Sequence, residues 1–286
     1  MDPFPQAEGI VAVGRGVRAA VRAAAKKGAT FDPDRLDRRD PELIATILPG
    51  LDFLNRHYFH LRIEGLEHLR REAALLVGNH NGGIMGPDLA GTLGSLWHTL
   101  GVEAPLYALT HDFAMRRLLP LGRLVQRLGG VRATRANAER VLLSGGQVLV
   151  YPGGDYDAFR HYRRRAEVVL GKRSGFVRVA QQLGVPIVPI VAHGAHRSAV
   201  IFHEGEALAR WFGLDRWAQI KRFPLALALP WGIAAGPWMP YAPLPFPILI
   251  RVLPPLRVAV SDDADEAREE VRRKMQSALA ELGGAS

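Results

Sequence analysis

Several features on which many enzymes depend are absent from this chain of 286 residues. It contains no cysteine, which excludes disulfides, thiolate nucleophiles and cysteine-ligated metal sites and fits a reducing cytoplasm. It contains no Gly-x-Ser-x-Gly motif, which argues against a serine hydrolase built on that turn. Its first residues show no signal-peptide pattern, because an acidic residue and two prolines precede any apolar run.

Acidic residues are fewer than basic residues in this chain. The chain has 28 Asp and Glu against 37 Lys and Arg, so its formal net charge is +9. Such a charge favours anionic partners, namely nucleic acid, a phosphate-bearing substrate or an anionic membrane surface. Few aromatic residues are interleaved with the basic clusters to stack on bases, so we expect no nucleic acid among the partners.

The sequence also lacks an uninterrupted apolar stretch that would span a membrane as a helix. Residues 223–250 carry no charge, but seven prolines interrupt them, and proline breaks helices. We expect loop and strand there, either buried in the core or at a membrane interface, where Trp231, Trp238 and Tyr241 suit the headgroup region. Residues 10–27 predict a basic helix that either docks on the domain or lies on an anionic membrane.

Apolar segments of strand type and helix type alternate along the rest of the chain. Strands are predicted at 73–78, 104–109, 129–132, 147–152 and 185–191, and helices at 41–60, 87–99, 112–127 with a break at 120–122, 134–146, 172–183 and 263–282. This alternation predicts an α/β fold, with a layered, mostly parallel central sheet flanked by helices and an N-terminal helical appendage. We expect residues 1–60 to form a helical, membrane-associating segment and residues 61–286 to form the main domain.

Residues 78–88 (GNHNGGIMGPD) hold a histidine and an aspartate eight positions apart, in a loop after a predicted strand. A histidine ring exchanges protons near neutral pH, and a carboxylate on one ring nitrogen fixes its tautomer. We therefore expect His80 to act as a general base that Asp88 orients. The glycines permit a tight backbone path, and the N–H groups of Gly82 and Gly83 are candidates for binding an oxyanion.

Two further loops combine glycines with arginines. In residues 151–165 (YPGGDYDAFRHYRRR), Gly153 and Gly154 offer N–H groups to an anion or a carbonyl. Residues 129–135 (GGVRATR) lead into a helix. The arginines either bind phosphates or form a solvated basic face. The candidate arginines are Arg132, Arg135, Arg160, Arg163, Arg164 and Arg165.

Taken in order, these segments resemble four motifs of the glycerolipid acyltransferase superfamily, which contains the lysophosphatidic acid acyltransferases. Asn79–His80 resembles its Asn-His-x4-Asp motif, and Gly129–Arg135 resembles a motif that runs from a glycine to an arginine six positions on. Tyr151–Gly154 stands where the family has Phe-Pro-Glu-Gly, and Val185–Pro189 matches its Val-Pro-Ile-Val-Pro strand. The resemblance spans about residues 73–192.

The chain departs from the superfamily pattern at two places. Met85 occupies the aspartate position of the first motif, so the acid comes at Asp88, and the third motif reads Pro-Gly-Gly instead of Pro-Glu-Gly. Both features resemble the branch of mono- and diacylglycerol acyltransferase-like proteins. They favour a neutral acylglycerol or another lipid alcohol over a phosphorylated acceptor, although Arg160 is a possible substitute for the missing arginine.

The resemblance implies transfer of a fatty acyl group from acyl-CoA, as co-substrate, to the hydroxyl of a glycerolipid or other lipid alcohol. It implies substrate contacts by Asn79, Tyr151, Pro152 and the arginines named above, and it implies no cofactor. No metal is expected either, because no nearby carboxylate other than Glu204 supports His193 and His196 as ligands. Three alternatives stay open: transfer to lysophosphatidate or glycerol-3-phosphate, hydrolysis of a thioester or lipid, and non-enzymatic binding of lipid. We expect a cytoplasmic protein that associates peripherally with an anionic membrane.

Overall fold

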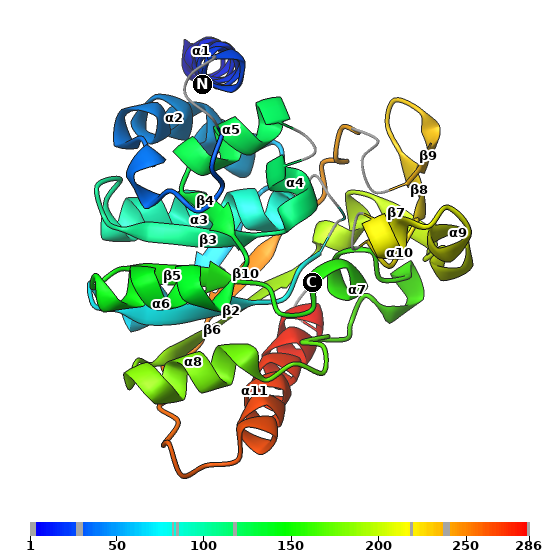
Figure 1. The fold of residues 1–286 in the computed structure, drawn as a ribbon. Helices are drawn as coiled ribbons and strands as arrows, with labels where there is room; N and C mark the ends of the chain where they lie inside the picture. Colours follow the sequence, from blue (N-terminus) through cyan, green and yellow to red (C-terminus); the bar gives the residue numbers. More distant parts are fainter. Residues whose placement is uncertain are drawn as a thin grey trace.

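The fold is that of a computed structural model, which describes residues 4–26, 31–81, 83, 86–116, 119–217, 220–236 and 241–284 (Figure 1). At its centre is a seven-stranded sheet with the order β1-β10-β6-β2-β5-β3-β4. The strands are β1 (Arg62–Glu64), β2 (Ala74–Gly78), β3 (Leu106–Thr110), β4 (Gly130–Arg132), β5 (Gln147–Val150), β6 (Ile187–His193) and β10 (Leu249–Val252). The five strands from β6 to β4 run parallel, while β10 runs antiparallel to β6 and edge strand β1 runs parallel to β10.

Helices cover both faces of this sheet (Figure 1). They are α1 (Phe4–Ala25), α2 (Pro41–His57), α3 (Pro87–Leu100), α4 (Asp112–Arg116), α5 (Leu119–Arg127), α6 (Arg135–Leu143), α7 (Gly154–Ala158), α8 (Gly175–Leu183), α9 (Glu206–Trp211), α10 (Leu214–Trp217) and α11 (Ala264–Gly284). Short 3-10 turns occupy Leu36–Arg38, Leu66–His68, Tyr162–Arg164 and Ala195–Arg197. The α/β prediction with a mostly parallel sheet is confirmed.

Side chains alternate between the two faces of each strand, so the sheet contributes to two cores. Leu76 of β2 packs in one core with Ile44 of α2 and Trp97 of α3. Its neighbours Leu75 and Val77 point to the opposite face and pack with α6, α8 and α11. The strands are therefore apolar on both faces, as expected for a parallel sheet covered by helices on each side.

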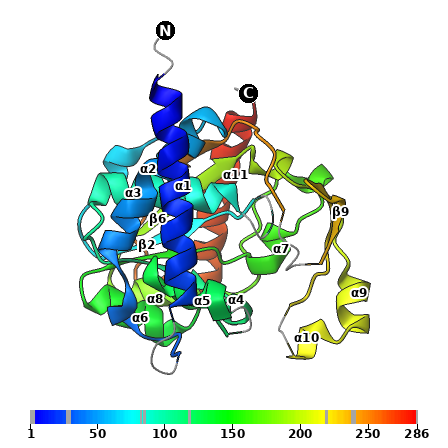
Figure 2. The same cartoon turned by 90° about the horizontal axis from the view of Figure 1, so that it is seen from above.

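The N-terminal helix α1 lies against α2 at the outside of the molecule (Figures 1 and 2). The two backbones approach closely, because a Cβ atom at Gly50 of α2 would lie 2.9 Å from the carbonyl oxygen of Ala12. Helix α2 belongs to the main core through Ile44 and Leu48, and the division of the chain at residue 60 stays a prediction. Within the described part of the chain, every helix is too short or too polar to traverse a bilayer.

Local sequence signals explain how α6 begins and how α4 and α5 pack together. Thr134 caps α6 by accepting a hydrogen bond from the Asn137 amide at 3.2 Å, which satisfies one of the free N–H groups of the first turn. The helix predicted at 112–127 with a break at 120–122 is two helices, α4 and α5, and α5 continues through 120–122, so the predicted position of the break is wrong. At Gly122, a Cβ atom would lie 2.1 Å from the Met115 carbonyl oxygen, so this glycine permits the two helices to pack closely.

A second sheet lies at the carboxyl-terminal end of the large one, beside α7 (Figure 1). Its antiparallel strands have the order β7 (Val200–His203), β8 (Leu225–Ala228) and β9 (Gly232–Ala235). Together with α9 and α10 it projects from one side of the molecule (Figure 2). The proline-rich segment 223–250 therefore supplies loop and strand, as predicted; Tyr241 within it is buried, and Trp238 lies outside the described residues.

Candidate active site

His80 and Asp88 meet at the carboxyl end of β2, the strand that lies between β5 and β6. The Nδ1 atom of His80 lies 3.1 Å from Oδ2 of Asp88, and the Asn81 amide donates to the same oxygen at 2.8 Å. Asp88 is fully buried in the first turn of α3, where a helix favours a negative charge. The contact that the sequence predicted between the two residues is present.

The hydrogen bond to Asp88 decides which ring nitrogen of His80 is available. A carboxylate only accepts, so Nδ1 carries the proton and Nε2 keeps a lone pair. Within the described residues, Nε2 makes no hydrogen bond, and the side chain is 18% exposed. The ring is thus held in the orientation and tautomer of a general base that a substrate can reach.

Gly86 is required for this contact. Its φ is +22°, and a Cβ atom on it would lie 2.9 Å from Cε1 of His80 and 3.2 Å from Oδ1 of Asp88. Gly83 has a φ of +71°, and a Cβ atom there would lie 2.4 Å from the hydroxyl of Tyr241. Both glycines let other groups approach the backbone, as expected from the glycine-rich sequence. Gly82 lies outside the described residues, so its predicted role stays a prediction.

Two asparagines fasten the His80 loop to the neighbouring strand β6. The Asn79 side chain donates to the Ala192 carbonyl at 3.0 Å and accepts from the Ala192 amide at 2.8 Å. The Asn81 side chain donates to the same carbonyl at 2.7 Å. Both asparagines are buried, so Asn79 anchors the backbone beside His80 in this structure.

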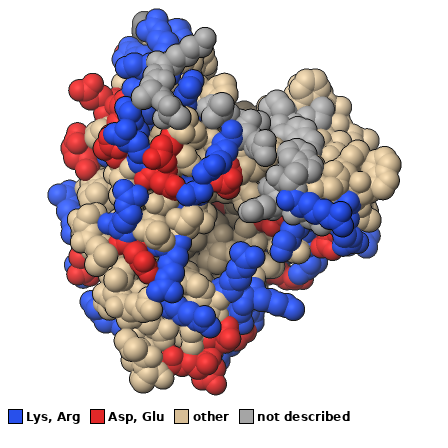
Figure 3. All heavy atoms as spheres, viewed as in Figure 1, with Lys and Arg blue, Asp and Glu red and all other residues tan. Residues whose placement is uncertain are grey.

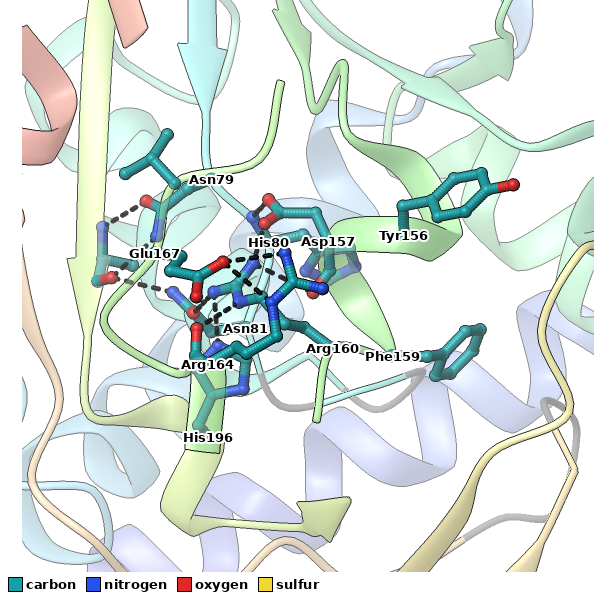
Figure 4. A network of polar contacts seen from close by, with 12 residues as sticks. Asn79, His80, Asn81, Tyr156, Asp157, Phe159, Arg160, Arg164, Glu167 and His196 are labelled. Carbon is teal, nitrogen blue, oxygen red and sulfur yellow. Dashed lines mark hydrogen bonds and ion pairs between the residues drawn. The ribbon is translucent and has the colours of Figure 1, made fainter. Parts of the chain in front are cut away.

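Beneath the loop lies a buried polar network centred on Arg160 (Figure 4). Its guanidinium forms an ion pair with Asp157 and donates to Asn81 at 3.1 Å and to His196 Nε2 at 2.6 Å. Asp157 in turn accepts the backbone N–H of His80 at 2.5 Å. Arg160 and Asp157 are both fully buried, so each supplies the charge that the other needs in a dry environment.

Burial also shifts the ionisation of two members of this network. It lowers the pKa of Arg160 to about 10, which leaves the guanidinium charged at neutral pH. Burial, followed by the nearby charge of Arg160, holds the pKa of His196 well below its usual value. A neutral His196 ring accepts from Arg160 through Nε2. Among the described residues, no three His, Asp or Glu side chains are placed to bind a metal ion.

Tyr151 borders the His80 ring. The two ring centroids are 5.0 Å apart, and the tyrosine hydroxyl hydrogen-bonds to Thr92 of α3. Burial, followed by the charge of Asp88, raises the pKa of Tyr151, so its hydroxyl stays protonated. A Cβ atom at Gly78 would lie 2.4 Å from this ring, which explains the glycine before Asn79.

The loop after β5 turns sharply at Pro152 and Gly153. A Cβ atom at Gly153 would lie 2.0 Å from the Val169 carbonyl oxygen, so no larger residue fits there without movement. The Gly154 amide donates to the Tyr151 carbonyl at 3.1 Å and is therefore already occupied. Pro152 is half-buried next to Tyr151, in the loop that leads into α7, the helix that carries the His80 partner Asp157.

The arginines predicted to bind phosphates differ in their partners and in their exposure to solvent. Arg132 pairs with Asp34, Arg135 with Glu139 and Arg164 with Glu167, whereas the side chain of Arg163 is exposed. Arg160, fully buried and bonded within the chain, lies away from solvent. Lys and Arg side chains are spread over the face in Figure 3, and several border a hollow at its centre.

The inward-facing partners of the site, Asn81, Asp157 and His196, were not predicted from the sequence. One signal was available, since Asp157 and Arg160 are three positions apart and can pair on one helical turn. The other partners come from the loop after β2 and from the turn after β6, and only the order of the strands brings them together.

Comparison with known proteins agrees with this architecture. Residues 51–282 match a sequence profile described as diacylglycerol acyltransferase. An uncharacterised protein of Mycobacterium tuberculosis is 28% identical over 253 residues, which are 85% of this chain and 67% of that protein. Diacylglycerol O-acyltransferase 2 of Danio rerio is 27% identical over 164 residues, which are 52% of this chain and 44% of that protein.

The solved structure of the 1-acyl-sn-glycerophosphate acyltransferase PlsC from Thermotoga maritima is similar along almost the whole chain. It covers 98% of this chain and 99% of its own, with a TM-score of 0.53 and 15% identity. At that identity the likeness concerns the fold alone, whereas the profile match covers most of the sequence. The chain belongs to the diacylglycerol acyltransferase family, within the glycerolipid acyltransferases that its four sequence motifs resemble.

Proposed function

We propose that this protein transfers a fatty acyl group from acyl-CoA to the hydroxyl of a neutral glycerolipid or another lipid alcohol. The observation that carries the proposal is the His80–Asp88 contact at 3.1 Å at the carboxyl end of the central strand β2, which leaves Nε2 unengaged by any residue that the structure describes. Ligands of α/β sheets bind at this edge. Membership of the diacylglycerol acyltransferase family supports the reaction class.

In the proposed reaction, Nε2 of His80 removes the proton of the acceptor hydroxyl as its oxygen attacks the thioester carbonyl. Asp88 holds Nδ1–H and stabilises the imidazolium that forms. The tetrahedral intermediate collapses with cleavage of the carbon–sulfur bond, and His80 returns its proton to the CoA thiolate. For the oxyanion we propose the N–H groups of Gly82, Gly83 and Gly153, because the Gly154 N–H is bonded within the chain.

The arginines favour a neutral acceptor. The Arg160 guanidinium is already bonded to Asp157, Asn81 and His196. It is therefore not available to replace the arginine that is missing from the third motif. Arg132 and Arg135 are likewise paired with carboxylates. Arg164 is half-exposed but is also paired with Glu167, so exposed Arg163 remains our candidate for the phosphates of CoA.

We also propose that the protein works in the cytoplasm, attached peripherally to an anionic membrane. A formal net charge of +9 supports attraction to such a surface. The acyl acceptor and the acyl chain of the donor both partition into lipid, so an enzyme that joins them benefits from residence at the interface.

The test is product identification by mass. Purified protein is incubated with acyl-CoA and, separately, monoacylglycerol, diacylglycerol, lysophosphatidate and glycerol-3-phosphate. We expect a new ester with a neutral acceptor and none with His80→Ala. Free fatty acid as the sole product would instead indicate a hydrolase, and an ester formed only with the phosphorylated acceptors would overturn the choice of acceptor.

A further inference from the structure

The small sheet carries an apolar surface of unusual construction. Four large apolar residues of the β8–β9 hairpin are about half exposed or more. They are Leu227 (51%), Leu229 (49%), Trp231 (52%) and Ile233 (61%), and we call them the hairpin face. On a water-facing sheet the outward positions are normally polar.

Large and small residues are distributed on this hairpin in the reverse of the usual way. Leu227 and Ile233 are register partners and point outward, while the neighbouring pair Ala226 and Ala234 points inward. The inward side is therefore lined by alanines, which gain little from burial. Packing among the described residues thus accounts for the inward alanines, whereas the outward Leu227 and Ile233 are large apolar side chains left half exposed or more.

Charge around the hairpin indicates what covers it. Residues 223–250 contain no charged side chain. The adjoining segment bears three exposed cations, Arg210, Arg216 and Lys221, together with Trp211, which is 78% exposed. An apolar and aromatic surface bordered by basic residues matches the layers of an anionic bilayer, where apolar groups enter the acyl region and cations meet lipid phosphates.

The base of the hairpin adjoins the catalytic loop. Tyr241, which packs with Ala228 and Ala234 of the hairpin, places its hydroxyl 2.4 Å from where a Cβ atom on Gly83 would lie. From the segment just before β8, buried Arg222 lies over the ring of Tyr156 in α7. The hairpin is therefore connected at its base to the loop that carries His80.

We infer that the hairpin face inserts into the surface of an anionic lipid layer and so turns the His80 site towards that layer. The inference that the protein binds lipid through this face is drawn from the exposed apolar residues and the neighbouring cations. Its consequence, that the acceptor reaches His80 directly from the lipid, rests on the proposed function. Figure 2 shows the hairpin region projecting away from the body of the molecule, as lipid insertion requires.

The binding is tested by flotation with phosphatidylcholine vesicles, with and without phosphatidylglycerol. We expect the wild type to float with the anionic vesicles, and the double variant Leu227→Ser/Ile233→Ser to bind at least about tenfold more weakly, because each lost apolar side chain contributes roughly that factor. The matched control is Leu143→Ser on α6, which is 73% exposed and is expected to bind as the wild type does.

Four results would overturn the inference. One is wild-type flotation by the double variant, and another is no flotation by the wild type. The third is binding that disappears with Val11→Ser/Val17→Ser on α1, whose side chains are also exposed, and survives in the hairpin variant. A hairpin variant that changes from dimer to monomer in size-exclusion chromatography while still floating identifies the face as a protein contact and likewise contradicts it.

Two assays separate this inference from the proposed function. His80→Ala should float like the wild type although it transfers no acyl group. The hairpin double variant should lose activity on a vesicle-embedded acceptor and keep it on a water-soluble short-chain acceptor. Equal loss on both acceptors in a normally folded variant would refute delivery from the lipid. Should the double variant fail to fold, the single variant Ile233→Ser answers the same questions.

Discussion

The network beneath His80 and the hairpin face depart from the usual distribution of residues in opposite directions. Arg160 and Asp157 are charged groups with no exposure, yet each is paired inside the chain. Leu227 and Ile233 are large apolar groups with half or more of their surface exposed. The charged groups of the first region find their partners within the protein. The apolar residues of the second region have the composition of a surface that binds another molecule.

The difference separates two kinds of contribution to function. The buried network fixes the geometry of the reacting group, because it holds the backbone of His80 and its neighbours from several elements. Leu227 and Ile233 of the hairpin face point outward and are half exposed or more, so we expect them to contribute little to the stability of the fold. Substitutions in the first region are therefore expected to change catalysis or folding, and those in the second to change association.

The largest expected effect is that of Asp88→Asn. The amide can still accept from Asn81 N–H, but it no longer stabilises an imidazolium and favours the wrong ring tautomer. We expect kcat to fall by about 10²- to 10⁴-fold, measured as ester formed from acyl-CoA, with the melting temperature little changed. Full activity in Asp88→Asn would show that the contact is structural.

Arg160→Met should come next, as a loss of stability. It leaves the Asp157 carboxylate buried without its cation, which costs about 3–5 kcal/mol. Denaturant unfolding measures this loss. The matched double variant Asp157→Asn/Arg160→Met removes the stranded charge and should recover part of the free energy of unfolding. If the single and double variants are equally unstable, the ion pair is not the source of the loss.

Gly86→Ala is expected to have a smaller effect that falls on activity. The added methyl would meet Cε1 of His80 at 2.9 Å, and displacement of a catalytic group by about 1 Å can cost about 10²-fold in rate. Gly184→Ala is the control, because Gly184 also has a positive φ, +64°, but has open space around its Cβ position. The control should lose some stability and no activity.

The smallest effect should come from Ile233→Ser in the absence of lipid. An exposed side chain with little packing changes the free energy of unfolding by less than about 0.5 kcal/mol. Leu76→Ala, in the core of β2, should cost about 2–5 kcal/mol by comparison. Comparable losses in both would mean that the hairpin face is part of the folded core, and the contrast between the two regions would fail.

Much of the fold and part of the site followed from the sequence. Apolar runs such as 73–78 and 185–191 predict buried parallel strands, because a strand covered on both faces needs no polar alternation. The His80–Asp88 contact followed from glycines that let one loop fold back on itself. Both inferences use neighbours in the chain, whose geometry is restricted by covalent linkage.

The burial of Arg160 did not follow, because arginine is ordinarily a surface residue. Its partners Asn81 and His196 are 79 and 36 positions away in sequence. They meet it only because β6, β2 and β5 are adjacent in the sheet, and a strand order is not written in any single segment. The outward direction of Leu227 and Ile233 was equally hidden, since it depends on which side of the hairpin faces the domain.

The hydrogen bonds that tie Asn81, Asp157, Arg160 and His196 together also bear on how the protein can evolve. A substitution at any one of them strands a buried donor or acceptor on another. Drift at a single position is therefore selected against, and change is tolerated only when partners change with it. Among descendants of the same ancestor, we expect these four positions to be inherited as a set, kept together or replaced together, across segments that are far apart in the gene.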